Sequence, residues 1–292
     1  MLQSTEGAGL LLLAPAKLNL TLEVLGKRSD GFHQIRSVLQ TVELWDSIYM
    51  ESKPTGVDFH CSRPNLENPE NLVLRVVEKL KRTQDSKGVS IRLHKVIPEA
   101  AGLGGGSSDA AVTLKGLDYL WRTDLGQERL SDIAGELSSD APFFLVGGTA
   151  HADGRGETII PLPPLPTHWA VILMPDISVP HPKTARLYGS LTPEHYTQGE
   201  HTTRLVDELT ANRATSNITE LLFNVFESVA FQIYPGLLKY REYFKQAGEL
   251  PVHIAGSGPA LFTITPDKER AKNIYNSLKK EKLEVYLART GN

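Results

Sequence analysis

The sequence predicts an α+β protein of two domains, each built from a layer of strands and a layer of helices. At 292 residues the chain is longer than a typical single domain of about 100–200 residues. Segments with strand periodicity and helix periodicity are mixed, without the regular βαβ spacing of a parallel sheet. Four prolines stand within residues 161–166, a stiff composition that is typical of a linker. We therefore expect one domain at residues 1–163 and another at residues 164–292.

The first predicted element is a strand over residues 17–24, where polar and apolar residues alternate strictly. We expect this strand to be half-buried. The side that begins at Leu18 would face a core, and the side that begins at Lys17 would face away from it. Residues 38–50 predict a second strand region, which we expect to be broken near residues 46–47.

The remainder of the first domain alternates between helix-period and strand-period segments. The predicted elements are a loop at 26–31, a helix at 71–82, a strand at 89–94, helices at 110–121 and 130–137, and a hairpin at 147–160. Asp140 and Pro142 predict the start of one more helix, because Asp caps helices well and Pro is tolerated in the first turn.

The second domain is predicted in the same way. The expected elements are a buried strand at 169–174, a mostly helical region at 200–248, a strand–turn–strand at 252–265, a helix at 268–281 and a short strand at 283–287.

The charge balance argues against nucleic acid as a partner. The chain has 31 Lys and Arg against 34 Asp and Glu, for a formal charge of −3. No half of the chain has a basic excess, and no Lys- or Arg-rich run occurs. Hydrophobic residues at 40% and charged residues at 22% are what a packed globular protein needs, which excludes a disordered chain.

The cysteine content and the absence of targeting signals predict a cytoplasmic protein without a membrane segment. Cys61 is the single cysteine, so neither an internal disulfide nor a Cys-based zinc site can form. The apolar run at residues 10–14 is far shorter than the roughly 20 residues of a spanning helix. The first nine residues contain no Lys or Arg, unlike a signal or transit peptide.

A glycine-rich segment at residues 97–111 carries the first functional signal. Its glycines let the backbone approach a ligand closely, and the N–H groups of the helix that follows favour a phosphate. Ser107 and Ser108 add hydroxyls. The segment lacks the Lys of a Walker loop, the third glycine of a dinucleotide-binding loop and the second glycine of a nucleophile elbow. We favour a phosphate-binding loop over the alternative of a merely flexible loop.

Three motifs of this sequence resemble the GHMP kinases, the superfamily named for galactokinase, homoserine kinase, mevalonate kinase and phosphomevalonate kinase. They are Ala-Pro-Ala-Lys-Leu-Asn-Leu at 14–20, the segment 98–111, and His-Ile-Ala-Gly-Ser-Gly-Pro-Ala at 253–260. With Asp-Gly-Phe-His at 30–33, they resemble the branch that phosphorylates the 2-hydroxyl of 4-diphosphocytidyl-2-C-methyl-D-erythritol in the non-mevalonate isoprenoid route. The resemblance implies an N-terminal domain like domain 2 of ribosomal protein S5 and a ferredoxin-like C-terminal domain.

The resemblance also implies which residues form the site. Lys17 would be the electrostatic catalyst and Asp140 the catalytic base. Without the resemblance, Lys17 would be interpreted as a solvated surface lysine and Asp140 as a helix cap. The implied ATP-binding residues are Pro98, Gly102, Leu103, Gly104, Gly105, Gly106, Ser107, Ser108 and Asp109, with Asn71, Leu72 and Lys95 at the adenine. The implied substrate-binding residues are Asn19, Phe32, His33, Tyr188, Gly256, Ser257 and Gly258, with Phe32 and Tyr188 on either side of the cytosine.

ATP is the implied co-substrate, with Mg²⁺ carried on its phosphates rather than in a dedicated protein cage. Two residues depart from the family pattern: Phe32 stands where Tyr is more frequent, and Val225 where Asp is usual. Two alternatives stay open, another GHMP kinase of the mevalonate or homoserine type, and a non-catalytic ligand sensor with the same fold. The oligomeric state is left undetermined by the sequence.

Overall fold

The computed structural model describes residues 3–4, 9–81, 87–211 and 218–291. The chain divides into two compact units that are discontinuous in sequence. The first unit comprises Met1–Ala16, Trp45–Glu99 and Gly104–Val146, and the second comprises Lys17–Leu44, Ala100–Leu103 and Gly147–Asn292. The boundary between residues 163 and 164 therefore stays a prediction.

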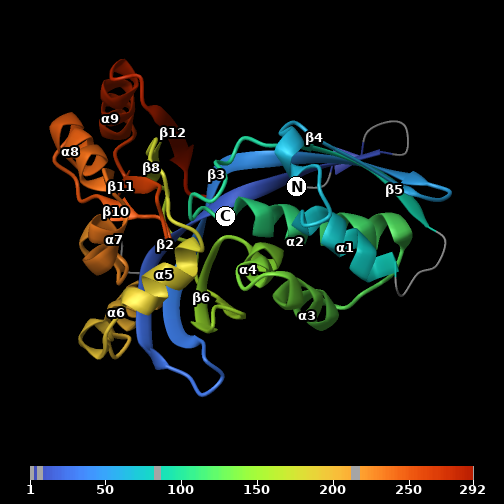
Figure 1. Cartoon of the computed structure of the whole chain (residues 1–292), viewed down its shortest axis with the longest axis horizontal. Helices are drawn as coiled ribbons and strands as arrows, with labels where there is room; N and C mark the ends of the chain where they lie inside the picture. The colour runs from blue at the N-terminus through green and yellow to red at the C-terminus, as the bar shows by residue number, and fades with distance from the viewer. Residues whose placement is uncertain (1–2, 5–8, 82–86, 212–217, 292) are drawn as a thin grey trace. The chain divides into compact units, whose positions relative to one another are not determined.

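In the first unit, strands form one layer and helices the other, as Figure 1 shows. The later part of β3 (His33–Lys53) pairs antiparallel with β5 (Gly88–His94), and β5 pairs parallel with β4 (Val57–Cys61). The early part of β2 (Gly9–Lys27) pairs with β1 (Gln3–Ser4). The helices are α1 (Leu72–Lys81), α2 (Gly105–Trp121), α3 (Gln127–Leu137) and α4 (Ala141–Val146), with a 3₁₀ turn at Pro64–Leu66.

Helix α2 lies at the centre of the first unit and packs against α1, α3 and α4. A Cβ atom at Gly116 would come within 2.8 Å of Leu12 and Met50, so the glycine lets α2 approach these strand residues closely. At the end of α2, the indole N–H of the fully buried Trp121 donates to the carbonyl oxygen of Gly88 at 3.3 Å. These contacts fix the helix that follows the glycine-rich segment.

The second unit contains a four-stranded antiparallel sheet in the order β10–β11–β8–β12. Its strands are β8 (Trp169–Met174), β10 (His253–Ile254), β11 (Leu261–Thr265) and β12 (Glu284–Arg289). Helix α9 (Lys268–Lys280) packs on β8, β11 and β12, and α8 (Leu237–Ala247) packs on α9 (Figure 1). The remaining helices are α5 (Lys183–Ser190), α6 (Glu200–Thr210) and α7 (Glu227–Ile233), with 3₁₀ turns at Pro193–His195 and Ile218–Glu220.

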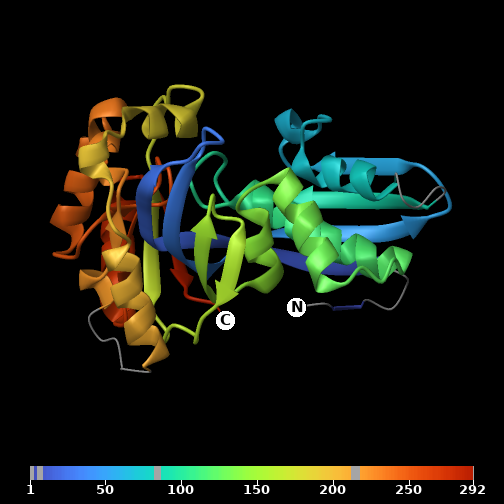
Figure 2. The ribbon, with the colours of Figure 1, turned by 90° about the horizontal axis from the view of Figure 1, so that it is seen from below.

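The same unit also contains the later part of β2 and the early part of β3. Strand β6 (Thr149–Gly154) pairs with β3 and forms a hairpin with β7 (Thr158–Pro161). Figure 2 shows this hairpin in green beside the blue strands. The two-residue strand β9 (Phe223–Asn224) pairs parallel with β2. The α+β class and the predicted hairpin are confirmed.

The prediction that the strand over 17–24 is half-buried is wrong. The strand exists as part of β2, and Leu18 and its apolar neighbours are buried, but the opposite polar face is buried as well. Lys17 is 3% exposed, Asn19 6%, and Thr21 and Glu23 0%. Alternation identifies the apolar face correctly, but it does not show that polar partners cover the other face.

The predicted break near residues 46–47 is also wrong, because β3 runs without interruption from His33 to Lys53. Asp46 is fully buried, and one of its carboxylate oxygens accepts the N–H groups of Val96 and Ile97 at 2.5 and 2.9 Å. A satisfied carboxylate does not interrupt the strand.

Helix α2 begins at Gly105, inside the glycine run rather than after it. Glycine is less costly in a first turn than in a helix interior, since first-turn N–H groups have no partner within the helix. Helix α1 ends at Lys81, and residue 82 of its predicted range lies outside the described residues, as do residues 212–217 of the predicted helical region. None of the helices in the described part of the chain has both the length and the apolar character needed to cross a membrane.

Candidate functional site

In the first unit, the loop predicted to bind phosphate lies at the start of α2. Gly104 precedes the helix with φ of +74°, a left-handed conformation that favours glycine. Gly105, Gly106 and Ser107 make up the first helical residues, and Gly106 is exposed. Among the described residues, a Cβ atom at Gly106 would meet Leu72 alone, at 3.9 Å. The first N–H groups of α2 thus lie in a part of the chain that glycine keeps open, which suits a phosphate.

Ser107 connects this loop to the segment of Asp140. The hydroxyl groups of Ser107 and Ser138 are 2.7 Å apart, and the backbone N–H of Asp140 donates to the Ser138 hydroxyl at 3.3 Å. Asp140 itself is half-buried and directly precedes α4. The structure therefore brings the predicted base and the predicted phosphate loop together within one compact unit.

A buried ion triad lies beside the same loop. The Lys95 ammonium contacts the carboxylates of Asp46 and Asp109, the latter at 2.6 Å. Burial raises the pKa of Asp109 to about 7, although the positive Lys95 opposes this shift. Burial alone would lower the pKa of Lys95, but the charges of Asp109 and Asp46 raise it above its ordinary value. Lys95 and Asp109 are both predicted to bind ATP, and in the structure their charged groups form an ion pair with each other.

Four other predicted ATP-binding residues have clear structural positions. The Asn71 side chain accepts the N–H of Val73 at 3.0 Å and donates to the carbonyl of Leu66 at 2.9 Å, so Asn71 fixes the start of α1. Leu72, the first residue of α1, lies next to Gly106. Pro98 is buried. Ser108 is buried with Asp109 in α2, so its side chain packs inside the unit.

In the second unit, Lys17 and Asn19 meet two of the predicted glycines. The Lys17 ammonium donates to the Asn19 side-chain oxygen at 2.6 Å. A Cβ atom at Gly256 would lie 3.2 Å from both groups and 3.0 Å from the carbonyl oxygen of Gly102. The backbone N–H of Lys17 donates to the carbonyl of Leu103 at 2.9 Å. Five predicted residues from three separate segments of the sequence therefore form one cluster: Lys17, Asn19, Gly102, Leu103 and Gly256.

The turn at Gly256, Ser257 and Gly258 is held closely by its surroundings. A Cβ atom at Gly102, where φ is +89°, would lie 1.8 Å from the carbonyl oxygen of Ala255, so only glycine fits there. The Tyr234 hydroxyl donates to the carbonyl of Ser257 at 2.9 Å. The backbone of this turn is thereby packed directly against the loop at residues 100–103.

The predicted substrate residues form two ring contacts in the second unit. The rings of His33 and Tyr188 are stacked, with centroids 4.8 Å apart. Phe32 is 53% exposed, and the Arg155 guanidinium lies 4.6 Å from the centre of its ring. Burial lowers the pKa of His33 below its ordinary value, and the positive charge of Lys27 lowers it further. A neutral imidazole suits hydrogen bonding to an uncharged base.

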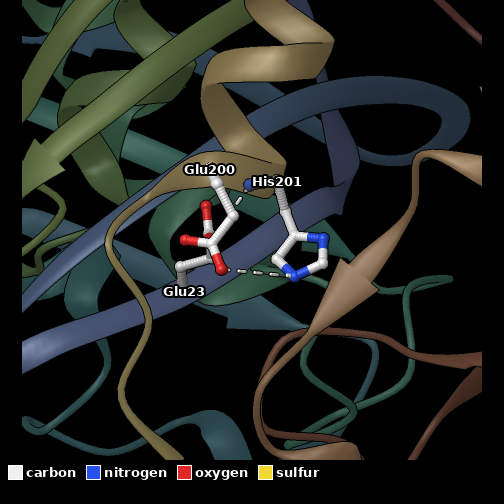
Figure 3. Close-up of side chains that lie close together, drawn as sticks. All are labelled: Glu23, Glu200 and His201. Carbon is white, nitrogen blue, oxygen red and sulfur yellow. Dashed lines mark hydrogen bonds and ion pairs between the residues drawn. The ribbon is translucent and has the colours of Figure 1, made fainter.

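Glu23, Glu200 and His201 come close enough to hold a metal ion, and Figure 3 shows Glu23 of β2 beside Glu200 and His201 at the start of α6. The Glu23 carboxylate, however, accepts the backbone N–H groups of His201 and Thr202 at 3.3 and 2.7 Å. A helix N-terminus attracts an anion and repels a cation. Glu23 therefore serves to dock α6 on β2, and this explains its complete burial.

Family models match two parts of the chain. The model of the GHMP kinases N terminal domain matches residues 71–148, and that of the GHMP kinases C terminal matches residues 205–284. A 4-diphosphocytidyl-2-C-methyl-D-erythritol kinase of Dehalococcoides mccartyi is 43% identical over 282 residues, which cover 96% of this chain and 98% of that protein. The chain belongs to the GHMP kinases.

Further relatives of this GHMP kinase agree. The 4-diphosphocytidyl-2-C-methyl-D-erythritol kinase of Exiguobacterium sibiricum is 38% identical over 96% of this chain and 97% of its own length. A crystal structure of 4-(cytidine 5'-diphospho)-2C-methyl-D-erythritol kinase has a TM-score of 0.81 and 32% identity, covering 97% of this chain and 99% of that chain. The homoserine kinase of Cytophaga hutchinsonii, at 18% identity and a TM-score of 0.75 over 99% and 96% of the two chains, shares the fold.

Two residues that support the predicted site of this GHMP kinase were missed by the sequence reasoning. The Asn224 amide donates to the carbonyl groups of Ile254 and Gly256, both at 2.8 Å. The Lys183 ammonium donates to the carbonyl of Ala100 at 2.6 Å and to that of Gly258. Both hold backbone rather than side chains, so no spacing or charge pattern marks them in the sequence.

Proposed function

We propose that this GHMP kinase transfers the γ-phosphoryl group of ATP to the 2-hydroxyl of 4-diphosphocytidyl-2-C-methyl-D-erythritol. The observation that carries the proposal is identity of 38–43% to kinases of that name over 96% of the chain. The solved structure at 32% identity is of a kinase named for the same substrate, which supports the proposal further. We keep the cytoplasm, expected from the cysteine content, as the compartment of this reaction.

The proposed reaction is a single displacement. The substrate hydroxyl oxygen bonds to the γ-phosphorus, the bond from that phosphorus to the β–γ bridging oxygen breaks, and ADP leaves. Asp140 takes the hydroxyl proton on its carboxylate. Lys17 places positive charge toward the phosphoryl oxygens, which is where negative charge accumulates in the transition state. The exposed N–H groups at the start of α2 bind the ATP phosphates.

We infer that the substrate end is formed by Phe32, His33 and Tyr188. The exposed Phe32 ring offers a stacking face for cytosine, and the neutral His33 offers a hydrogen-bonding edge. Tyr188 is stacked on His33 and contacts Phe226 edge-on, so its ring is well fixed. Asn19 and Gly256 orient the part of the substrate that carries the reacting 2-hydroxyl.

Magnesium ions are proposed to arrive with ATP and to neutralise charge on its phosphates. Among the described residues, the one group of His and carboxylate side chains close enough to hold a metal ion includes no residue of the phosphate loop. The serine hydroxyls at the start of α2 would then lie near the phosphates and the metal that they carry.

The deciding experiment measures ADP release with the diphosphocytidyl substrate, mevalonate and homoserine, each tested with ATP and Mg²⁺. We expect turnover with the first alone. Turnover only with another alcohol would reassign the substrate, and no turnover with any would favour a ligand sensor.

The Asp140→Asn variant separates catalysis from folding, because Asn also caps helices well. We expect an unchanged melting temperature and a kcat lower by about 10²–10⁴-fold, the usual contribution of a positioned base. A variant that keeps most of its kcat would mean that Asp140 is a helix cap only.

A further inference from the structure

The position of the Lys17 ammonium depends on the side chain of Asn19, and the structure shows what holds that side chain. Asn19 is 6% exposed, and its amide oxygen accepts from Lys17 at 2.6 Å. An amide group presents an oxygen on one side and an NH₂ group on the other. If the amide turned over, it would place two N–H donors against the ammonium. The orientation of Asn19 therefore decides whether its amide attracts or repels the Lys17 ammonium.

The other end of the Asn19 amide lies on Ser37. The Asn19 nitrogen donates to the Ser37 hydroxyl oxygen at 2.8 Å. The Ser37 hydroxyl itself lies 2.5 Å from the backbone carbonyl oxygen of Thr21. A carbonyl can only accept, so the single hydroxyl proton of Ser37 goes to Thr21. Toward Asn19, Ser37 can therefore act only as an acceptor, and only the NH₂ side of the amide satisfies it.

Ser37 is in turn fixed by the pairing of β2 with β3. The N–H of Val38 donates to the Thr21 hydroxyl at 2.9 Å, and that hydroxyl lies 2.9 Å from the hydroxyl of Thr202 in α6. Ser37 and Thr21 are both 0% exposed. Water does not reach these groups to replace a lost partner, and each hydrogen bond restricts the next.

We propose that Ser37 is a positioning residue, which orients the Asn19 amide so that its oxygen holds the ammonium of Lys17. This inference rests on the proposed function, since it gives Lys17 a catalytic role. Without Ser37, the Asn19 NH₂ group would be buried with no acceptor, which is unfavourable. Asn19 would then turn toward another acceptor, and its oxygen would leave Lys17.

The test compares Ser37→Ala with Thr202→Val. Both substitutions remove one fully or almost fully buried hydroxyl from the same network, but the Thr202 hydroxyl lies on that of Thr21, whereas the Ser37 hydroxyl accepts directly from Asn19. Wild-type turnover is measured first, so a failure of the proposed function is seen before any variant is compared. We expect Ser37→Ala to lower kcat by about tenfold, the effect of one buried hydrogen bond in the transition state, with the KM for ATP within about twofold. Thr202→Val should keep the wild-type kcat.

A wild-type kcat in Ser37→Ala would overturn the inference. It would also be overturned by an equal loss of kcat in Thr202→Val at a similar melting temperature, because the loss would then reflect general loosening. If Ser37→Ala does not fold, Ser37→Cys replaces it, since a thiol has nearly the same size but is a weak acceptor. We expect Ser37→Cys to lower kcat by a smaller factor, and an unchanged kcat there would equally refute the role of Ser37.

Discussion

The Asp109→Asn variant should make the stability of the protein less dependent on pH. Asp109 is buried beside Lys95 and Asp46, and one lysine cannot neutralise two carboxylates. Among the described residues, the second carboxylate oxygen of Asp109 has no hydrogen-bond partner. These features agree with a pKa raised from 3.8 to about 7. A protonated Asp109 closely resembles Asn in shape and charge.

The sign and size of the effect follow from proton linkage. Between pH 3.8 and about 7, the folded state binds the Asp109 proton and the unfolded state does not. The free energy of unfolding therefore falls as pH rises through this window and levels off above the folded pKa. For these two pKa values, the wild-type protein should lose about 2 kcal/mol more than Asp109→Asn between about pH 5.5 and about pH 8.

The measurement is urea unfolding of both proteins at the two pH values, with the urea dependence checked for equal slopes. Glu128→Gln, which removes an exposed carboxylate from the first turn of α3, is the control and should behave as the wild type does. If Asp109→Asn has the same pH dependence as the wild-type protein, Asp109 is ionised when folded and the reasoning fails.

Three further substitutions test other parts of the site. Lys17→Met retains the packing of the lysine stem and removes its charge, so kcat should fall at least about a hundredfold with a circular dichroism melt close to wild type; intact activity with lower stability would make Lys17 structural. Phe32→Ala should raise the KM of the cytidyl substrate by a factor equivalent to about 1–3 kcal/mol, while Phe32→Tyr stays near neutral; a raised KM for ATP instead would place this ring at the adenine. Gly102→Ala should lower the free energy of unfolding by more than about 2 kcal/mol, because its Cβ would overlap the Ala255 carbonyl. Gly147 also has a positive φ, but an added Cβ atom there would meet none of the described residues within 4 Å. Gly147→Ala should therefore lower the free energy of unfolding by only about 1–2 kcal/mol, from backbone strain. Equal losses of unfolding free energy in the two variants would contradict the steric argument.

Much of the fold could be predicted because the hydrophobic pattern is strong and local. The alternation over residues 17–24 predicts a strand, and the spacing of Leu114, Leu117 and Trp121 predicts the helix that became α2. Asp46 shows where this reasoning fails. Its polarity indicates a break in β3, but the N–H groups that satisfy its carboxylate lie some fifty residues later in the chain. Periodicity contains no information on such distant partners.

Some residues of the candidate site could likewise be predicted from the sequence, and others could not. The motif residues Lys17, Asn19 and Gly256 could be selected from the sequence, and the structure brings them into one cluster. Asn224 and Lys183 could not be selected, because they bind backbone carbonyl groups. Every residue type has a backbone carbonyl group. A side chain that binds one therefore has no characteristic partner residue that a sequence motif could include.

The segments in which hydrophobic periodicity gives the wrong prediction are also those that contain or adjoin the predicted site residues. Burying the polar face of β2 is less favourable than burying a second row of leucines, since every donor and acceptor there needs a partner. The same holds for two carboxylates around Lys95 beside the phosphate loop. A chain selected for stability alone would replace these groups by apolar ones. Charged groups at Lys17 and at the start of α2 are what the proposed phosphoryl transfer would require, because it needs charge at defined positions.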